Sequence, residues 1–369
     1  MKRLTGILGL ILIFSICSFS QEEDPSLFKF DTLKVRKKFQ IVGLPIVFYT
    51  PETSVGFGAG TQLFLHRQAN IYNARESNIL VTAIYTLNKQ FIIDARPKIY
   101  FQFGDWMMDG SFKYKIFPNK FWGIGNFTPD SNEESYNMES FEVSAAFLKY
   151  LPPSLNFGLE YVFADHKMLE IKEGGILDTS AIPGSRGCRA SGIFVVFNLD
   201  NRDNIFFPYK GNFMQIKAGF ASKVLGSTYS YNKFIIDLRK YIRLTRTIVL
   251  ASQIYLEDGY GTVPFQSKSY LGGPERNRGY YKGRYIDDHL GSAQVEVRWR
   301  FTPRWVLAGF ASGGEVSSLP WDYFRDLKFS FGGGIRYQLL KKAPTLLRFD
   351  AGIGEDGNIG FYFSVNEAF

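Results

Sequence analysis

The residues of this sequence best suited to chemistry are the basic side chains of one glycine-rich segment. Residues 271–285 read LGGPERNRGYYKGRY, with Arg278 near the middle and Gly279 after it. A guanidinium group can hold a carboxylate through two hydrogen bonds, so Arg278 is suited to an ion pair inside a protein. Together, the basic residues of the segment could attract a phosphate or an acidic substrate; they are Arg276, Arg278, Lys282 and Arg284. Solvation of the segment, or contact with lipopolysaccharide, is an equally good interpretation.

Residue patterns typical of enzymes and metal sites are not found. The sequence has three histidines at scattered positions, without the spacing of a zinc site. No Gly-x-Ser-x-Gly elbow accompanies an ordered Asp and His. Gly56, Gly58 and Gly60 alternate within a predicted strand, which is not the spacing of a dinucleotide-binding turn. We therefore expect no catalytic residue, no metal and no cofactor, while a site assembled from several strands stays open as an alternative.

The first residues have the organisation of a secretory signal peptide. Lys2 and Arg3 are basic, residues 7–14 are apolar but too few to span a membrane, and small residues precede the expected cleavage point. We predict that residues 1–20 are removed after export. Residues 21–40 are polar and charged, and we predict that they form a short periplasmic lead-in.

Composition narrows the class of protein further. Aromatic residues make up 17% of the chain, yet its mean hydropathy is only −0.10. After the signal peptide, no apolar run is long enough for a membrane helix. Removal of Cys17 would leave Cys188 as the only cysteine, which excludes an internal disulfide. The net charge of +8 includes no dense basic cluster, so we expect no nucleic acid partner.

Strands must position these residues, because hydropathy alternates with a period of two beyond residue 40. In residues 292–301, Val295 and Val297 fall on one face, whereas Glu296 and Arg298 fall on the other. Similar alternation predicts sixteen strands, at residues 42–50, 55–66, 77–88, 90–103, 106–116, 136–150, 155–171, 190–200, 211–224, 228–243, 247–258, 289–301, 304–315, 328–340, 345–354 and 358–369. An even number is expected of a single-chain bacterial barrel.

A membrane barrel turns its apolar faces outward toward lipid, whereas a soluble sandwich turns them inward. The signal peptide, the aromatic content and the number of strands favour the barrel. We therefore predict an all-β chain in which residues 41–369 form one transmembrane antiparallel β-barrel, integral to the bacterial outer membrane. The long connections, at residues 117–135, 172–189, 259–288 and 316–327, all follow odd-numbered strands. This asymmetry is typical of short periplasmic turns and long outer loops.

The last predicted strand indicates an assembly signal and the partner that reads it. Phe361, Phe363, Val365 and Phe369 share one face, and Glu367 interrupts the pattern at a position expected near the membrane interface. A terminal aromatic residue on a final strand resembles the signal by which the barrel assembly machinery recognises precursors. Outer-membrane lipid and lipopolysaccharide are the other expected partners.

Residues 271–285 resemble the sixth outer loop of the BamA/TamA family of surface-antigen barrels, which carries an Arg-Gly-aromatic tip. The matching residues are Arg278, Gly279 and Tyr280. In that family the loop folds back into the lumen, where its arginine meets carboxylates of the inner wall. Wall side chains alone cannot fill a lumen of sixteen strands, so a plugging loop is also reasonable physically.

Further stretches resemble the same family, so the resemblance covers roughly residues 42–369. Residues that look like its turn between strands eight and nine are Asp200, Arg202, Asp203, Pro208 and Gly211. Residues that look like its twelfth strand and the following turn are Glu296, Arg298, Thr302 and Pro303. Residues 45–60 look like the start of the barrel in its shorter members.

Several wall residues are candidate partners for the loop arginine. Alternation turns Glu296 toward the lumen, which makes it the first choice for Arg278. The other inward carboxylates are Asp94, Asp237 and Asp350, and Arg298 faces the same way. The family usually places an aspartate on strand thirteen, where this sequence has Ser312. The resemblance therefore implies that one ionic partner of the loop is missing.

The resemblance implies a role in outer-membrane biogenesis or in translocation of protein or lipid. Family members with that role carry periplasmic POTRA domains that bind clients, and residues 21–40 are too few to form one. We therefore expect a member that lacks POTRA domains and works with a separate periplasmic partner. A passive or gated channel and a structural surface barrel are the alternatives, and we expect no enzymatic activity.

Overall fold

A computed structural model describes residues 39–50, 54–65, 77–87, 89–101, 105–320, 322–338 and 346–369. The predicted signal peptide and almost all of the predicted lead-in lie outside these residues. The sequence prediction of sixteen strands is confirmed, because one antiparallel sheet contains sixteen strands that pair in chain order. No described helix has the length and apolar character needed to cross a membrane.

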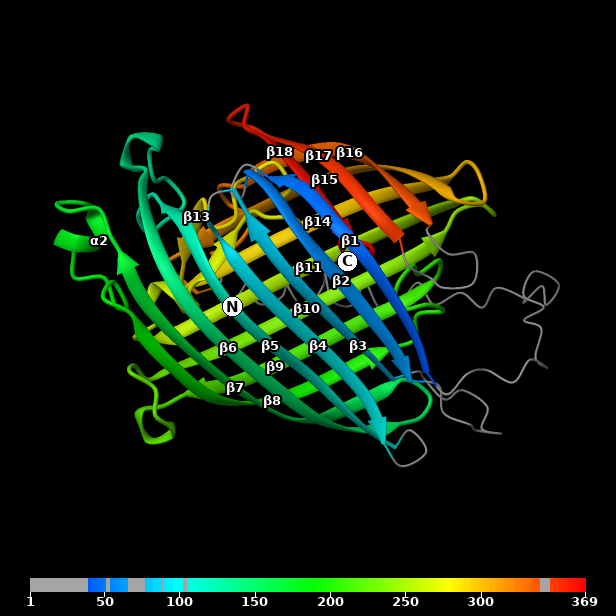
Figure 1. The fold of residues 1–369 in the computed structure, drawn as a ribbon, viewed down its shortest axis with the longest axis horizontal. Helices are drawn as coiled ribbons and strands as arrows, with labels where there is room; N and C mark the ends of the chain where they lie inside the picture. The colour runs from blue at the N-terminus through cyan, green and yellow to red at the C-terminus, as the bar shows by residue number, and fades with distance from the viewer. Residues whose placement is uncertain are drawn as a thin grey trace.

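The strands of the large sheet run in both directions along a tilted wall (Figure 1). Their bounds are β1 Phe39–Thr50, β2 Ser54–Leu65, β3 Ser77–Thr86, β4 Phe91–Phe101, β5 Trp106–Phe121, β6 Glu134–Leu151, β7 Leu155–Glu170, β8 Cys188–Asp200, β9 Gly211–Ala221, β10 Tyr231–Arg243, β11 Ile248–Gly261, β14 His289–Arg300, β15 Trp305–Ser317, β16 Lys328–Gln338, β17 Leu346–Gly354 and β18 Ile359–Val365. The order begins at β1 and ends at β18, and these two strands approach each other.

Several boundaries differ from the sequence prediction by a few residues, and the largest differences are at the ends of β5 and β18. Strand β5 continues to Phe121 and β6 begins at Glu134, because the two strands stay paired without interruption up to the pair Phe121–Glu134. Strand β18 ends at Val365, four residues before the predicted end. The long loop before β14 also holds a two-stranded ribbon, made of β12 Ser269–Leu271 and β13 Tyr285–Asp287, which alternation did not predict because each strand has only three residues.

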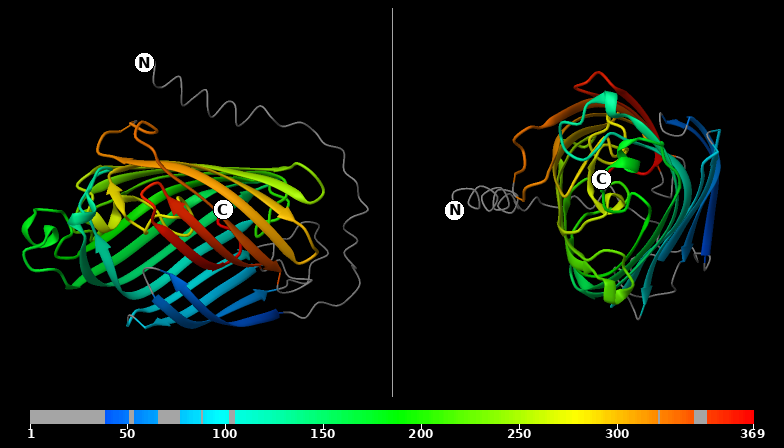
Figure 2. Two further views of the ribbon diagram at one scale, coloured as in Figure 1. Left: turned by 90° about the horizontal axis from the view of Figure 1, so that it is seen from above. Right: turned by 90° about the vertical axis from the view of Figure 1, so that its left-hand side faces the viewer.

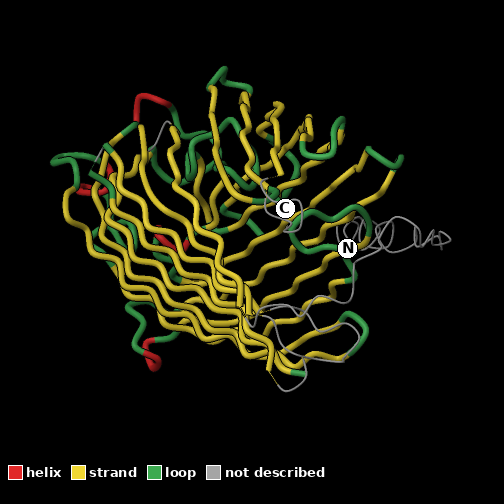
Figure 3. Tube along the Cα trace, turned by 45° about the vertical axis from the view of Figure 1, so that its right-hand side comes forward, coloured by secondary structure: helices red, strands yellow, loops and turns green. Residues whose placement is uncertain are grey.

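The two faces of the wall have the polarity of a membrane barrel. On β14, Val295, Val297 and Trp299 are exposed, while Glu296 and Arg298 are buried. Exposed apolar residues and buried charges are the reverse of a water-soluble sheet, so the exposed face suits lipid and the buried face lines the lumen. The tube in Figure 3 shows that strands make up nearly all of this wall.

Long loops gather at one end of the barrel, and they pack together there. The cluster joins Phe121 of β5, Leu177 of α2 (Ile176–Thr179), Phe265 of η5 (Phe265–Ser267) and Ile286 of β13. The end-on view shows segments of the long loop before β14 inside the ring of strands (Figure 2). The short turns β6–β7, β10–β11 and β14–β15 lie at the opposite end of the barrel (Figure 1).

Candidate functional site: a luminal arginine cluster

The tip of the long loop is pressed against the inner wall by apolar packing. Leu271, Tyr280 and Tyr285 of the loop form one buried cluster with Leu290 of β14 and Val316 of β15. The two strands β12 and β13 stand at the base of the tip and pair with each other. Residues 272–284 are thereby held as a compact turn inside the lumen.

Positive φ angles shape the tip, and glycines of β17 receive it. Gly279 has φ +124°, and a Cβ atom there would lie 2.6 Å from the main chain of Ile353 and Gly354. A Cβ at Gly352 would lie 2.4 Å from the carbonyl oxygen of Arg278, and one at Gly354 would lie 2.9 Å from the Tyr280 ring. The tip therefore lies directly on the backbone of β17, which only glycines allow.

Arg278 joins two carboxylates of the inner wall. Its Nη1 atom lies 2.6 Å from Asp350 Oδ2, and its Nη2 atom lies 2.7 Å from Glu296 Oε2. The guanidinium carbon also lies 3.5 Å from the centre of the Phe310 ring. All three charged side chains are inaccessible to solvent. The structure thus brings together three residues that the sequence singled out, with one guanidinium spanning two strands, β14 and β17.

Both carboxylates are shared with further arginines. Glu296 also accepts hydrogen bonds from Arg298 Nε at 2.7 Å and from Arg336 Nη2 at 3.2 Å. Asp350 Oδ1 accepts from Arg336 Nη1 at 2.6 Å, and Asp350 lies 3.6 Å from Arg348. We call this set, with the addition of Glu367, the luminal cluster. Its members are Arg278, Arg298, Arg336, Arg348, Glu296, Asp350 and Glu367.

Two tyrosines fix the backbone beside Arg278. The Tyr362 hydroxyl accepts a hydrogen bond from Gly279 N at 3.0 Å and donates to the Tyr280 carbonyl at 3.2 Å. The Tyr280 hydroxyl donates to the Phe329 carbonyl at 2.9 Å and accepts from Glu355 N at 3.1 Å. Burial raises the pKa of Tyr280 above its usual value, so this loop hydroxyl stays neutral and keeps its proton to donate. Sequence patterns did not point to Tyr362, because its partners lie about eighty residues away along the chain.

Ser312 takes no part in holding Arg278. It faces the lumen on β15, where its hydroxyl lies 2.7 Å from the Ser330 hydroxyl of β16. The second carboxylate of the loop arginine is Asp350 of β17 instead. Glu315 is engaged elsewhere, since it accepts hydrogen bonds from the backbone of Arg325 and Asp326 at 2.7 and 2.8 Å.

Ser312→Ala is therefore expected to lower the free energy of unfolding by only about 1 kcal/mol, because it removes one hydrogen bond between neutral side chains. The loop should remain as resistant to trypsin as in the wild type. Limited proteolysis of the purified barrel in detergent checks this. Release of the loop by this substitution would mean that Ser312 holds the tip.

The other inward carboxylates pair on their own strands. Asp94 accepts hydrogen bonds from Arg96, at 2.8 Å from Nη2, and Asp237 accepts from Arg239, at 3.0 Å from Nε. Each pair joins residues two apart on the same face of a strand, so neither carboxylate meets Arg278 in the structure. Their predicted role as loop partners is not supported by this geometry.

The predicted turn between strands eight and nine lies at the end of the barrel opposite the long loops. Asp200 pairs with Arg202 at 2.9 Å, and Asp203 Oδ1 accepts from the Tyr209 amide at 2.9 Å. Pro208 is buried, and Gly211 has φ +112° with no room for a Cβ atom beside Asn201. The turn carries Phe207, which packs against Val306 of β15 and Leu346 of β17.

The predicted common face of the C-terminal residues is wrong for Phe369. Phe361 is exposed on the outer face of β18, and Phe363 is partly buried. The side chain of Val365 lies outside the described residues. After Val365 the chain turns at Asn366, which has φ +66°, and Phe369 is buried against Tyr241 and Ala251 on the inner wall.

Glu367 is also inside the lumen and not at the membrane interface, as the sequence had suggested. Its Oε2 atom lies 3.2 Å from Arg336 Nε and 3.7 Å from Arg298 Nε. Arg298 Nη2 donates to the Phe369 main-chain oxygen at 3.1 Å. Residues 366–369, which we call the luminal tail, therefore share two arginines with the docked loop. The end-on view places the C-terminus within the ring of strands (Figure 2).

Metal binding finds no support in this arrangement. Among the described residues, no group of three or more His, Cys, Asp or Glu side chains could hold a metal ion. Arginines occupy the space between the carboxylates of the luminal cluster. The chemistry available here is reversible ion pairing between a loop, a tail and the wall.

Comparison with known proteins places this geometry in a family. The profile of the Omp85 superfamily domain matches residues 93–369. BamA of Haemophilus ducreyi lacking POTRA domains 1–3 has a similar fold, with a TM-score of 0.59 and 15% identity over 90% of this chain and 70% of that one. No curated protein sequence matches the chain.

Two structures of CdiB are also similar in fold. CdiB from Acinetobacter baumannii gives a TM-score of 0.56 at 12% identity, and CdiB from Escherichia coli gives 0.57 at 10% identity. The matches cover 90% and 88% of this chain but only 60% and 61% of the CdiB chains. At such identities the likeness shows the fold, and the profile match over most of the chain shows that it belongs to the Omp85 superfamily.

Proposed function

We propose that this barrel resides in the outer membrane and acts in its biogenesis, or in the translocation of protein or lipid across it. The observation that carries this proposal is the docking of Arg278 between Glu296 and Asp350 inside the lumen. Superfamily members are insertases or transporters and not enzymes. The docked tip is the feature by which the sequence resembles the BamA/TamA family.

Fully buried ion pairs contribute little net free energy to folding. Several charges must lose their hydration, and apolar residues of similar volume often stabilise a protein as well or better. Buried ion pairs instead favour one geometry over others, in some proteins that have been studied. This supports a role in which the loop must occupy one specific seat while the barrel works.

The proposal includes the parts of the chain outside the described residues. Residues 1–20 would direct export, and residues 21–40 would remain in the periplasm. Client capture would fall to a separate periplasmic partner, which is the task of POTRA domains elsewhere in the family. The barrel assembly machinery would insert this chain, reading the aromatic residues of its final strand.

Deletion of this protein should lower the abundance of other outer-membrane barrels or disturb lipid asymmetry. Quantitative proteomics of the outer membrane and surface labelling of phospholipids measure the two effects. Complementation should succeed with the wild type and with Ser312→Ala, and should fail with Gly279→Ala, which displaces the loop tip. An unaltered envelope in the deletion strain would contradict the proposal.

A gated channel is the second candidate, favoured by the charged inner face of β4 and β5. Lys98, Lys113 and Lys115 face the lumen there and keep partial solvent exposure, beside Asp109 and Glu142. In planar bilayers, a loop that plugs the lumen should keep conductance low in the wild type and let it rise in Arg278→Ala. A large, steady conductance that Arg278→Ala does not change would favour an open channel and argue against the plug.

A further inference from the structure

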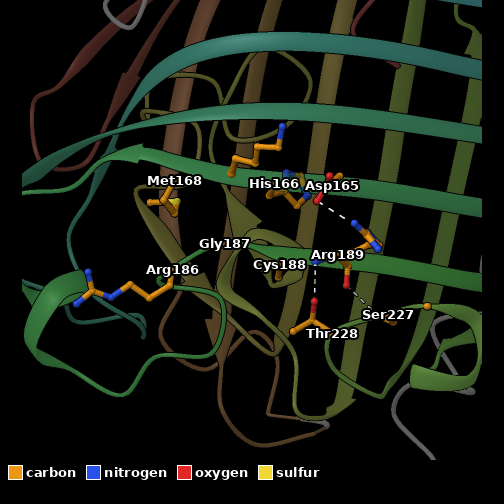
Figure 4. A pocket seen from close by; sticks show the side chains of 11 residues that line it. Asp165, His166, Met168, Arg186, Gly187, Cys188, Arg189, Ser227 and Thr228 are labelled. Atoms are coloured by element: carbon orange, nitrogen blue, oxygen red, sulfur yellow. Dashed lines mark hydrogen bonds and ion pairs between the residues drawn. The ribbon is translucent and has the colours of Figure 1, made fainter.

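An open polar cleft of about 610 Å³ lies on the barrel wall at the end that carries the long loops. It is lined by the end of β7 (Asp165 to Met168), the approach to β8 (Arg186 to Arg189) and the loop of Gly226, Ser227 and Thr228 (Figure 4). None of these residues belongs to the luminal cluster. A volume of this size is in the range of small-molecule sites.

Strand parity shows that the charged residues of the cleft point outward. Asp165 on β7 lies opposite Arg189 on β8. Six residues earlier on β7, Leu159 lies opposite Val195, and both are exposed apolar residues on the same face of the sheet. The pairs Tyr161–Ile193 and Phe163–Ser191 lie between them. Since successive side chains alternate, Asp165 and Arg189 continue the lipid-facing surface and are the first charged pair beyond it.

Tyr161 marks the edge of the apolar surface on this side. Its hydroxyl lies 2.9 Å from the hydroxyl of Ser191, while its ring is exposed among apolar neighbours. Tyrosine is enriched where the hydrocarbon core meets the headgroups, because one end of the ring is apolar and the other polar. The cleft thus begins at the depth of lipid headgroups, in the leaflet facing the outer loops.

Cations of the cleft are held weakly by their neighbours. Arg189 Nε lies 4.0 Å from Asp165, and Lys167 Nζ lies 4.0 Å from Glu139, with side chains 53% and 65% exposed. Arg186 is bonded to Asp178 at 2.8 Å and is also exposed. Exposed pairs of this kind contribute little free energy, so an anion of higher charge can compete for the same cations.

The backbone beneath these cations is firmly bonded. Arg189 N donates to Thr228 Oγ1 at 2.9 Å, and the Arg189 carbonyl accepts from Thr228 N at 2.8 Å and from Ser227 Oγ at 3.1 Å. Gly187 has φ +98°, where a Cβ atom would lie 2.6 Å from the His166 carbonyl. Figure 4 shows these bonds tying the loop to β8 beside Arg189. The cleft is therefore preformed on a rigid scaffold.

We propose that this cleft binds the phosphorylated sugar headgroup of a glycolipid in the outer leaflet, of the lipid A class. Arg189 and Lys167 would donate to the phosphate oxygens, as guanidinium and ammonium groups do. Asp165, Ser227 and Thr228 supply the acceptors and hydroxyls that sugar hydroxyls require. The acyl chains would lie along the apolar surface that ends at Tyr161. This inference rests on residence in the outer membrane and not on any role in assembly or transport.

Purified full-length protein should retain lipid A when reconstituted with it, and the double variant Lys167→Gln/Arg189→Gln should retain about tenfold less. The probe is native mass spectrometry after reconstitution with lipid A, with dephosphorylated lipid A, or with phosphatidylglycerol. Only phosphorylated lipid A should remain bound to the wild type. The single variant Arg189→Lys, which keeps both positive charges, should retain most of the lipid A that the wild type retains.

The matched control is Lys120→Gln, which removes an exposed cation that pairs with Glu133 at 2.6 Å on another hairpin. It should leave lipid retention unchanged. Heat-modifiable mobility on gels shows whether each variant has folded. Equal retention by the wild type and the double variant would overturn the proposal. Equal retention of all three lipids would overturn it too, because the phosphorylated headgroup would not be what is recognised.

Discussion

Glu296→Gln is expected to lower the free energy of unfolding by about 3–5 kcal/mol, because it removes the carboxylate from the centre of a buried network. Glu296 accepts hydrogen bonds from Arg278 and Arg298 at 2.7 Å and from Arg336 at 3.2 Å. An amide of the same shape keeps an acceptor but no charge, so three buried guanidinium groups lose a common counter-ion. Urea-dependent folding into detergent micelles, followed by tryptophan fluorescence and gel mobility, measures the loss.

Glu142→Gln is the matched control for that substitution. Glu142 lies on the same luminal face, but it pairs with Lys115 at 3.1 Å and both side chains are partly exposed. Its replacement should change the free energy of unfolding by less than about 1 kcal/mol. Equal losses in the two variants would show that Glu296 holds the loop no more strongly than an ordinary wall pair does.

Gly279→Ala should release the tip of the loop from the wall while leaving the sheet intact. The new Cβ would lie 2.6 Å from the backbone of Gly354, at a φ of +124° that L-residues rarely adopt. Arg278 cannot then reach Glu296 and Asp350 together. Trypsin should cleave within residues 276–284 at least about tenfold faster than in the wild type, since a loss of 1.4 kcal/mol in loop docking already shifts the open population tenfold.

Gly309→Ala provides the comparison, because a Cβ there would meet nothing within 4 Å. It lies on the same sheet and carries the same change of residue, so it controls for the chemistry of the substitution. Its loop should resist trypsin as the wild-type loop does. If Gly279→Ala also left the loop protected, the close approach of the tip to β17 would not be what seats it.

Alternation was sufficient to predict the sixteen strands and the inward direction of Glu296 and Asp350. It works here because one face meets lipid and the other meets the lumen, so each strand carries a strong two-residue signal. The alternation does not indicate where along the barrel axis an inward side chain lies. Asp94 and Asp237 also face inward, and only the three-dimensional structure shows that they pair with Arg96 and Arg239 instead.

Features that depend on close approach or on a change of direction could not be predicted. Gly352 and Gly354 alternate on β17 like many small residues in the chain, and nothing local shows that a loop lies across them. Phe369 has the parity of the outer face, but Asn366 turns the chain inward before it. Asparagine tolerates a positive φ better than most residues, which was the one available signal.

The luminal tail has a consequence for the charge of the luminal cluster. Within the luminal cluster, Arg278, Arg298, Arg336 and Arg348 face only Glu296 and Asp350 until the tail arrives with Glu367. Glu367 lies beyond the end of β18, so this third carboxylate reaches the cluster only when the tail docks. Without the docked tail, the side chains of this cluster carry an excess of two positive charges, which falls to one when Glu367 takes its place. Docking of the tail therefore changes the electrostatic potential at the seat of the loop.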